Sequence, residues 1–139
     1  MRTQNTATVT EQDRSRLEEM VRSLRTVGDP FRCHLRELEE RLRDAAIVPP
    51  ARLDSGVISM NSDVRLEDLD SGRRQTLTLA YHGTSEVFDS RLSVLTPLGV
   101  KLLGARVGDV IGWPVPCNVR RVKVKEILYQ PEAAGAFNL

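Results

Sequence analysis

Apolar residues near the start of the chain recur with helical spacing. Those of the first stretch follow the i, i+3, i+4, i+7 pattern of one helix face: Leu17, Met20, Val21 and Leu24. Thr10 and Asp13 have the spacing of a capping box, with Asp in the position usually held by Glu. Gly28 is suited to end the helix. The pattern predicts an amphipathic helix from Thr10 to about Thr26.

A second helical stretch follows at once. Its apolar residues have the 4-3-4-3 spacing of a coiled-coil seam: Phe31, Leu35, Leu38, Leu42 and Ala45. Asp29 is suited to the N-cap and Pro30 to the first helical position, and Pro49 ends the pattern. Two such helices joined by a tight turn predict an antiparallel coiled-coil hairpin over residues 11–48, roughly 23 Å long at ~1.5 Å per residue.

Beyond Pro50 the pattern changes from helical to alternating. Leu77, Leu79 and Tyr81 alternate with polar residues, as in a strand with one buried face. The strand candidates are residues 57–60, 64–66, 75–81, 110–115 and 119–129. One short helix among about five mostly antiparallel strands predicts an α+β domain over residues 49–139.

The short helix lies in the run Leu92–Asp109. Thr96 is suited to cap it, and Pro97 to its first turn, where the missing N–H costs nothing. Leu98 and Leu102 form an i, i+4 apolar pair, and Gly104 is suited to end the helix. The run contains no nucleophile, metal-ligand cluster or phosphate-binding loop, which indicates an element that presents a surface.

Composition and charge narrow the function classes. The chain has 139 residues, 40% of them hydrophobic, and a net charge of +1. A net charge so close to zero does not favour nucleic acid as a direct partner. No apolar run approaches the ~20 residues that span a bilayer, and the polar residues 1–10, predicted to be a flexible tail, lack the apolar core of a signal peptide. We therefore expect a cytoplasmic protein without membrane contact.

The sequence predicts neither a metal nor a cofactor. Cys33 and His34 are adjacent, so on a helix they point about 100° apart, and no second Cys or His pair completes a site. Cys33 and Cys117 fall in different predicted elements and are expected to be free intracellular thiols.

Several motifs together resemble a known family. Ser93–Gly99, then Leu102–Gly104, then Gly108 and Asp109 before a strand resemble the C-terminal domain of Gre-type transcription elongation factors. Residues 57–62 and 128–135 are similar to the branch known as regulators of nucleoside diphosphate kinase. The resemblance covers roughly residues 11–139 and implies a fold like that of the FK506-binding prolyl isomerases (FKBP-like).

The resemblance implies a partner. In the family, the segment equivalent to Ser93–Gly99 faces a coiled coil of the largest RNA polymerase subunit, on the rim of the secondary channel. The residues that match the motif are Ser93, Thr96, Pro97 and Gly99, with Leu98 in its apolar position and Thr96 in place of a more common Ser. Polymerase binding is thus expected through these five residues, and nucleic acid is reached only through the polymerase.

The expected arm tip is Gly28, Asp29 and Pro30. Transcript cleavage factors carry a tip Asp and a nearby Glu that hold a catalytic metal, because hard divalent cations require several oxygen ligands. Here Asp29 stands alone, since Arg32 follows three positions later, and the arm is about half as long as in those factors. The resemblance therefore implies a non-enzymatic regulator that competes with cleavage factors.

Other functions stay open. The similarity to the nucleoside diphosphate kinase regulators implies an effect on the level or activity of that kinase. A prolyl isomerase requires an aromatic-lined pocket, whereas the aromatic residues here are few and scattered. A basic stripe could contact phosphates, although a solvated strand face protected against edge pairing is the simpler interpretation: Arg120, Arg121, Lys123 and Lys125. The apolar hairpin seam also leaves a homodimer open.

Overall fold

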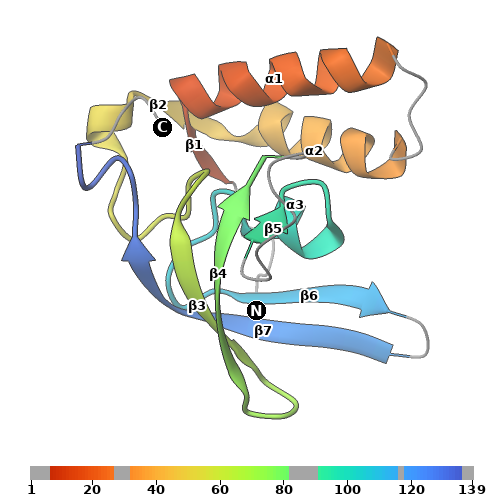
Figure 1. Cartoon of the computed structure of the whole chain (residues 1–139), viewed down its shortest axis with the longest axis vertical. Coiled ribbons are helices and arrows are strands. Elements are labelled where there is room, and N and C mark those ends of the chain that lie inside the picture. The colour runs from red at the N-terminus through yellow and green to blue at the C-terminus, as the bar shows by residue number, and fades with distance from the viewer. Residues whose placement is uncertain (1–6, 27–31, 82–90, 116–117, 136–139) are drawn as a thin grey trace.

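The computed structural model describes residues 7–26, 32–81, 91–115 and 118–135. Two helices, α1 (Glu11–Thr26) and α2 (Arg32–Asp44), lie side by side above a curled sheet (Figure 1). The short helix α3 (Pro97–Leu102) lies between α2 and the sheet. This arrangement confirms the mixed α+β class.

The main sheet has the strand order β5-β4-β3-β7-β6. Its strands are β3 (Asp63–Asp68), β4 (Arg74–Ala80), β5 (Arg91–Ser93), β6 (Val110–Val115) and β7 (Asn118–Tyr129). All neighbouring pairs are antiparallel except β4 and β5. Alternate side chains face the core, as the sequence pattern predicts, and are buried: Val64, Leu66, Leu77, Leu79, Val122 and Val124.

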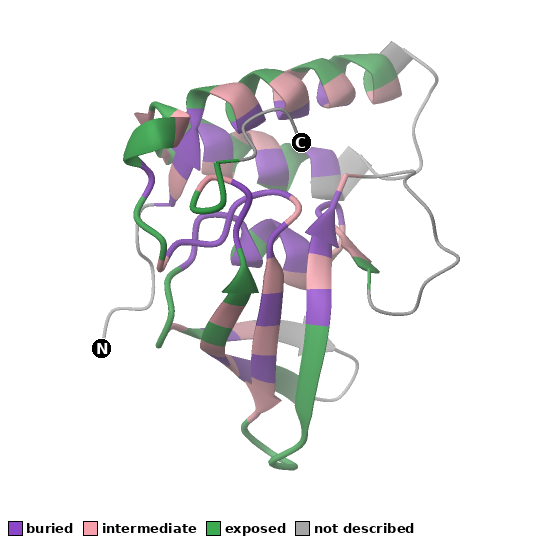
Figure 2. Cartoon of the chain, turned by 60° about the vertical axis from the view of Figure 1, so that its left-hand side comes forward, coloured by how far each residue is buried: buried purple, intermediate pink, exposed green. Residues whose placement is uncertain are grey.

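The two long helices place their apolar faces on the rest of the protein. Their buried residues are Leu17, Val21, Leu35, Leu38 and Leu42. These belong to one hydrophobic cluster that also contains the sheet residues and α3, and Figure 2 shows the buried faces of the helices turned toward the domain. The helix pair thus forms a layer over the domain, while coiled-coil geometry stays a prediction. The expected arm tip, Gly28 to Pro30, lies outside the described residues.

Residues 7–10, the described part of the expected flexible tail, differ from that prediction. Strand β1 (Thr8–Thr10) pairs in parallel with β2 (Ala46–Val48), and Ala46 N donates to the carbonyl of Ala7 over 2.8 Å. Ala7 and Val9 are buried. Consequently α2 ends at Asp44, before the prolines that were expected to stop it. Local pattern could not show this pairing, because the partners are more than thirty positions apart.

The segment 57–60 also differs from prediction. It forms only an isolated bridge between Val57 and Arg106, although Ile58 N donates to Ala105 O over 2.8 Å. All four side chains are buried, including Ser59. The sequence pattern predicted a strand with one buried face, whereas the side chains of this segment are all buried. The fifth sheet strand is instead β5, which begins at Arg91.

Asp13 joins α1 to the β-domain from a buried position. Its backbone N–H donates to Thr10 Oγ1 over 3.0 Å, which confirms half of the predicted capping box. Its carboxylate accepts from Met60 N over 3.1 Å and from the Tyr81 hydroxyl over 3.4 Å. Burial raises the pKa of Asp13 to about 6, although the Met60 hydrogen bond opposes this rise.

Candidate functional site

The segment Ser93–Gly99 forms a tightly bonded helix entrance. Thr96 is the N-cap of α3, and its Oγ1 accepts from Gly99 N over 3.0 Å. The same hydroxyl donates to Ser93 O over 2.8 Å, while Leu95 N donates to Ser93 Oγ over 3.1 Å. These bonds confirm the predicted cap, with Pro97 at the first helical position. The entrance is therefore held rigid by short-range contacts.

Gly99 is required by close packing. A Cβ added at this position lies 2.1 Å from the Ser93 carbonyl oxygen and 2.9 Å from Thr96 Oγ1. No side chain fits at such distances, so the tight path from β5 into α3 depends on glycine here.

The five predicted binding residues differ in their exposure to solvent. Gly99 is buried, whereas Ser93, Thr96, Pro97 and Leu98 are half-buried. Leu98 packs against the core cluster on one side and faces an open hollow on the other. The helix entrance thus presents Leu98 as an apolar contact point.

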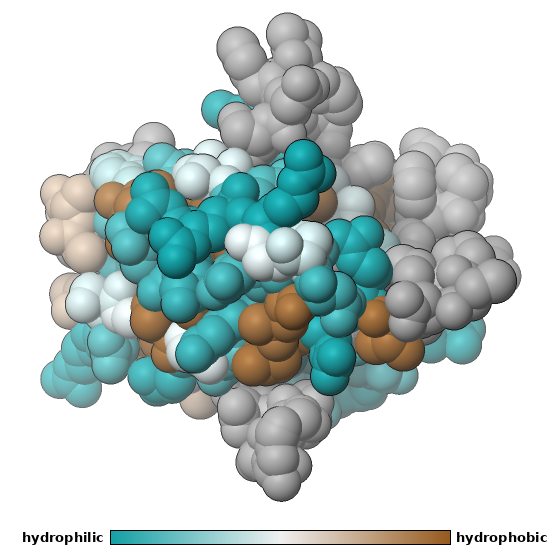
Figure 3. Space-filling model, turned by 90° about the horizontal axis from the view of Figure 1, so that it is seen from below, coloured by the Kyte–Doolittle hydropathy of each residue, from teal (hydrophilic) through white to brown (hydrophobic). Residues whose placement is uncertain are grey.

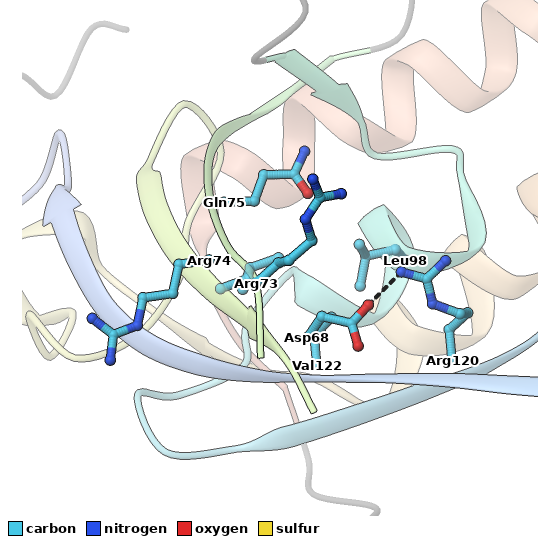
Figure 4. A pocket seen from close by; sticks show the side chains of 8 residues that line it. Asp68, Arg73, Arg74, Gln75, Leu98, Arg120 and Val122 are labelled. Carbon is cyan, nitrogen blue, oxygen red and sulfur yellow. Dashed lines mark hydrogen bonds and ion pairs between the residues drawn. The ribbon is translucent and has the colours of Figure 1, made fainter. Parts of the chain in front are cut away.

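The hollow beside Leu98 has a volume of about 480 Å³. It lies between the start of α3 and the inner sheet face, where β3 ends and β4 begins (Figure 4). Leu66 and Val122 supply apolar lining from two neighbouring strands. The polar lining consists of Asp68, Arg73, Arg74, Gln75 and Arg120.

Charge in the hollow is unevenly balanced, with three arginines against one aspartate. Asp68 forms an ion pair with Arg120 and accepts the backbone N–H groups of Asp70 and Ser71 over 2.8 and 3.2 Å. The bond from Arg120, followed by these two backbone bonds, lowers the pKa of Asp68. Arg120 is therefore locally neutralised. Arg74 extends away from the other lining side chains (Figure 4), so the excess positive charge inside the hollow belongs to Arg73.

The basic stripe does not act as one surface. Arg120 lines the hollow, whereas its neighbour Arg121 lies on the opposite face of β7 and pairs with Asp70 at 3.6 Å. Lys125 pairs with Glu67 at 3.3 Å. Because β7 lies between β3 and β6, protection of a sheet edge is the wrong explanation for these charges.

The lower face of the protein is mainly hydrophilic, with small, separate apolar patches (Figure 3). The exposed large apolar residues among those described are Leu69, Val107, Val110, Val119, Leu128 and Tyr129. Within the described ranges, no three His, Cys, Asp or Glu side chains are grouped to hold a metal ion. No helix among the described residues is both long and apolar enough to cross a membrane.

Sequence reasoning did not identify Asp68, Arg73 and Gln75 as site residues. The turn at residues 70–72 was recognisable from its Asp-Ser-Gly composition. The position of this turn next to α3 was not recognisable from the sequence. The turn and the helix are about 25 positions apart, and only the curling of the sheet brings them together.

Comparison with known proteins defines the class of this fold and site. The model of the family "Transcription elongation factor, GreA/GreB, C-term" matches residues 53–129, more than half of the chain. The chain therefore belongs to the GreA/GreB family, and the matched region contains α3, its cap and every residue that lines the hollow.

Particular relatives refine the assignment. The regulator of nucleoside diphosphate kinase from Escherichia coli K12 is 39% identical over 103 residues, covering 73% of this chain and 76% of the relative. GreA from Clostridium novyi is 29% identical over 91 residues, or 66% of this chain and 57% of GreA. A GreA/GreB structure from Nitrosomonas europaea has a TM-score of 0.74 and 32% identity, covering 91% of this chain and all of that one. These names describe regulators and elongation factors, not catalysts.

Proposed function

We propose that this protein is a non-enzymatic transcription regulator that binds RNA polymerase beside its secondary channel. The observation that carries the proposal is the rigid entrance to α3, which presents Leu98 next to the hollow inside the family-matched region. A helix entrance with an adjoining apolar side chain and a polar rim has the composition of a protein-binding patch. The partner surface is the rim coiled coil of the largest subunit, which the family resemblance implies.

The protein acts in the cytoplasm, and nucleic acid is contacted only through the polymerase. The α1–α2 arm covers or enters the channel mouth without delivering a metal ion, because Asp29 has no acidic partner three positions later. The arm thereby competes with longer-armed cleavage factors for one docking surface.

Binding is tested with core RNA polymerase and a double variant, Pro97→Ala with Leu98→Asp. A charge at the Leu98 position prevents apolar contact with the partner, so we expect at least tenfold weaker binding. Val107→Asp is the matched control, since Val107 is exposed but does not line the hollow. Equal binding by wild type and the double variant contradicts docking through α3, provided that circular dichroism shows both to be folded.

Competition is tested on stalled elongation complexes with a full-length cleavage factor. We expect excess protein to displace that factor and to slow transcript cleavage, while producing no cleavage alone. Unchanged cleavage at saturating protein contradicts the shared docking surface. Cleavage by the protein itself contradicts the non-enzymatic role.

A second candidate is regulation of nucleoside diphosphate kinase, which the 39% identity to a regulator of that name favours. Direct action predicts a change in the rate of phosphate transfer when the purified protein is added to the kinase. Action through transcription predicts no change in that assay but altered kinase abundance in cells that lack the protein.

A further inference from the structure

We propose that the hollow beside α3 accepts a carboxylate of the docked protein partner, and that Arg73 is the residue that binds it. This inference rests on the proposed function, because the partner is the polymerase surface that contacts Leu98. It adds a chemical requirement: the partner presents an acidic side chain next to an apolar one, so that Arg73 and Leu98 are engaged together.

Among the described residues that line the hollow, one arginine is available for such a partner. Arg120 is already paired with Asp68, whose other contacts hold it in place. Arg74 extends away from the other lining side chains in Figure 4. No described carboxylate forms an ion pair with Arg73. Within the part of the chain that the structure describes, Arg73 is therefore the positive charge next to Leu98 that has no acidic partner.

The backbone of Arg73 is held by hydrogen bonds, whereas its guanidinium group forms no ion pair with a described residue. Its carbonyl oxygen accepts from Asp68 N over 2.8 Å, and its own N–H donates to Ser71 Oγ over 3.2 Å. Gln75 shares the inner sheet face with Leu66, since these two residues are paired across β3 and β4. In Figure 4 the Gln75 amide lies beside the Arg73 side chain, with its oxygen toward Arg73 and its nitrogen, a second donor for a carboxylate, turned away from it.

The lining favours a single protein carboxylate over nucleic acid. Binding to a phosphate backbone requires several available cations in a row. Here one guanidinium is available, Asp68 is resident, and part of the lining is apolar. Arg121, Lys123 and Lys125 do not extend the hollow, because they alternate with the buried Val122 and Val124 and so lie on the opposite face of β7. Arg121 and Lys125 also have acidic partners of their own.

The test measures affinity for core RNA polymerase with the full chain, comparing Arg73→Glu, Arg73→Ala and Arg74→Glu. Charge reversal at Arg73 places like charges together, so we expect binding to weaken at least tenfold, and several-fold for Arg73→Ala. Arg74→Glu has the same change in net charge but an outward position, and we expect less than a twofold effect. Raising salt should weaken the wild type more than Arg73→Ala.

A reciprocal exchange identifies the partner group. Replacing acidic residues of the rim coiled coil by Lys, one at a time, should restore binding to Arg73→Glu at a single position. If Arg73→Glu binds like wild type while Pro97→Ala with Leu98→Asp does not, docking stands and the carboxylate subsite is wrong. If wild type binds no polymerase, both proposals are wrong. If Arg73→Glu loses affinity for a single-stranded oligonucleotide but not for polymerase, the hollow is a nucleic-acid site and the inference is overturned.

Discussion

Arg41 of α2 donates from Nε to the carbonyl oxygen of Leu103, just beyond α3, over 2.8 Å. Its Nη2 also donates to the Lys101 carbonyl over 3.0 Å. Burial lowers the pKa of Arg41, and the nearby charge of Asp109 partly opposes that effect. One side chain of α2 thus binds carbonyl groups at the end of α3, the candidate docking helix. These hydrogen bonds connect the α1–α2 arm directly to the docking site.

Removal of that link should cost stability. Arg41→Ala leaves two carbonyl groups without their donor, so we expect the free energy of unfolding to fall by about 2–3 kcal/mol in urea titration. Arg43→Ala, on an exposed position of the same helix, should change it by less than about 0.5 kcal/mol. Similar losses for both variants contradict a specific role for the Arg41 contacts.

The N-cap of α3 should depend on the hydroxyl group of Thr96 and not on the methyl group of that side chain. Thr96→Ala removes the acceptor of the Gly99 N–H, and we expect it to lower the free energy of unfolding by about 1 kcal/mol. Thr96→Ser retains the hydroxyl and should stay within about 0.5 kcal/mol of wild type. The comparison is made by thermal unfolding, and a loss for Ser as large as that for Ala shows that packing matters instead.

Gly99→Ala should be costly for a steric reason. The added methyl group meets the Ser93 carbonyl at 2.1 Å, so the loop must shift, and we expect a loss of about 1–3 kcal/mol. Gly112→Ala is the matched control, because the nearest atom lies 3.5 Å from the added Cβ, in ordinary contact. Polymerase binding should fall for Gly99→Ala but not for Gly112→Ala.

Asp13 should make stability depend on pH. Its pKa is raised from 3.8 to about 6 in the folded protein, so the folded state binds the proton more strongly than the unfolded chain. Its contribution is fully present below pH 3.8 and is lost as pH rises through 6, a decrease of about 3 kcal/mol at ~1.4 kcal/mol per pKa unit.

The substitution Asp13→Asn tests this contribution. Asn retains a carbonyl acceptor for the Met60 N–H but does not titrate. In urea titrations between pH 4 and 7, the variant should gain stability relative to wild type as pH rises. A constant difference between the two proteins across that range contradicts the raised pKa.

Local chemistry made α3 predictable from residue order. Thr96 and Pro97 mark its start, and the two hydrogen bonds of the Thr96 side chain span three positions each. The tail at residues 8–10 was not predictable in this way. Its strand exists because Ala46 N bonds to Ala7 O, so its stability comes from a distant segment and not from the composition of residues 1–10.

The sequence by itself determined the amphipathic helices, most of the alternating strands and the capped entrance at Thr96, because each depends on neighbours a few positions apart. It also carried the family resemblance, through motifs that are read directly from residue order. The tertiary structure alone decided which charges remain available. Curling of the sheet pairs Arg120 with Asp68 and leaves Arg73 beside Leu98. The sequence pattern alone does not distinguish these two arginines, because both are charged residues in or next to predicted strands. The free energy of a charge depends on what lies within a few ångströms, and only the fold sets that distance.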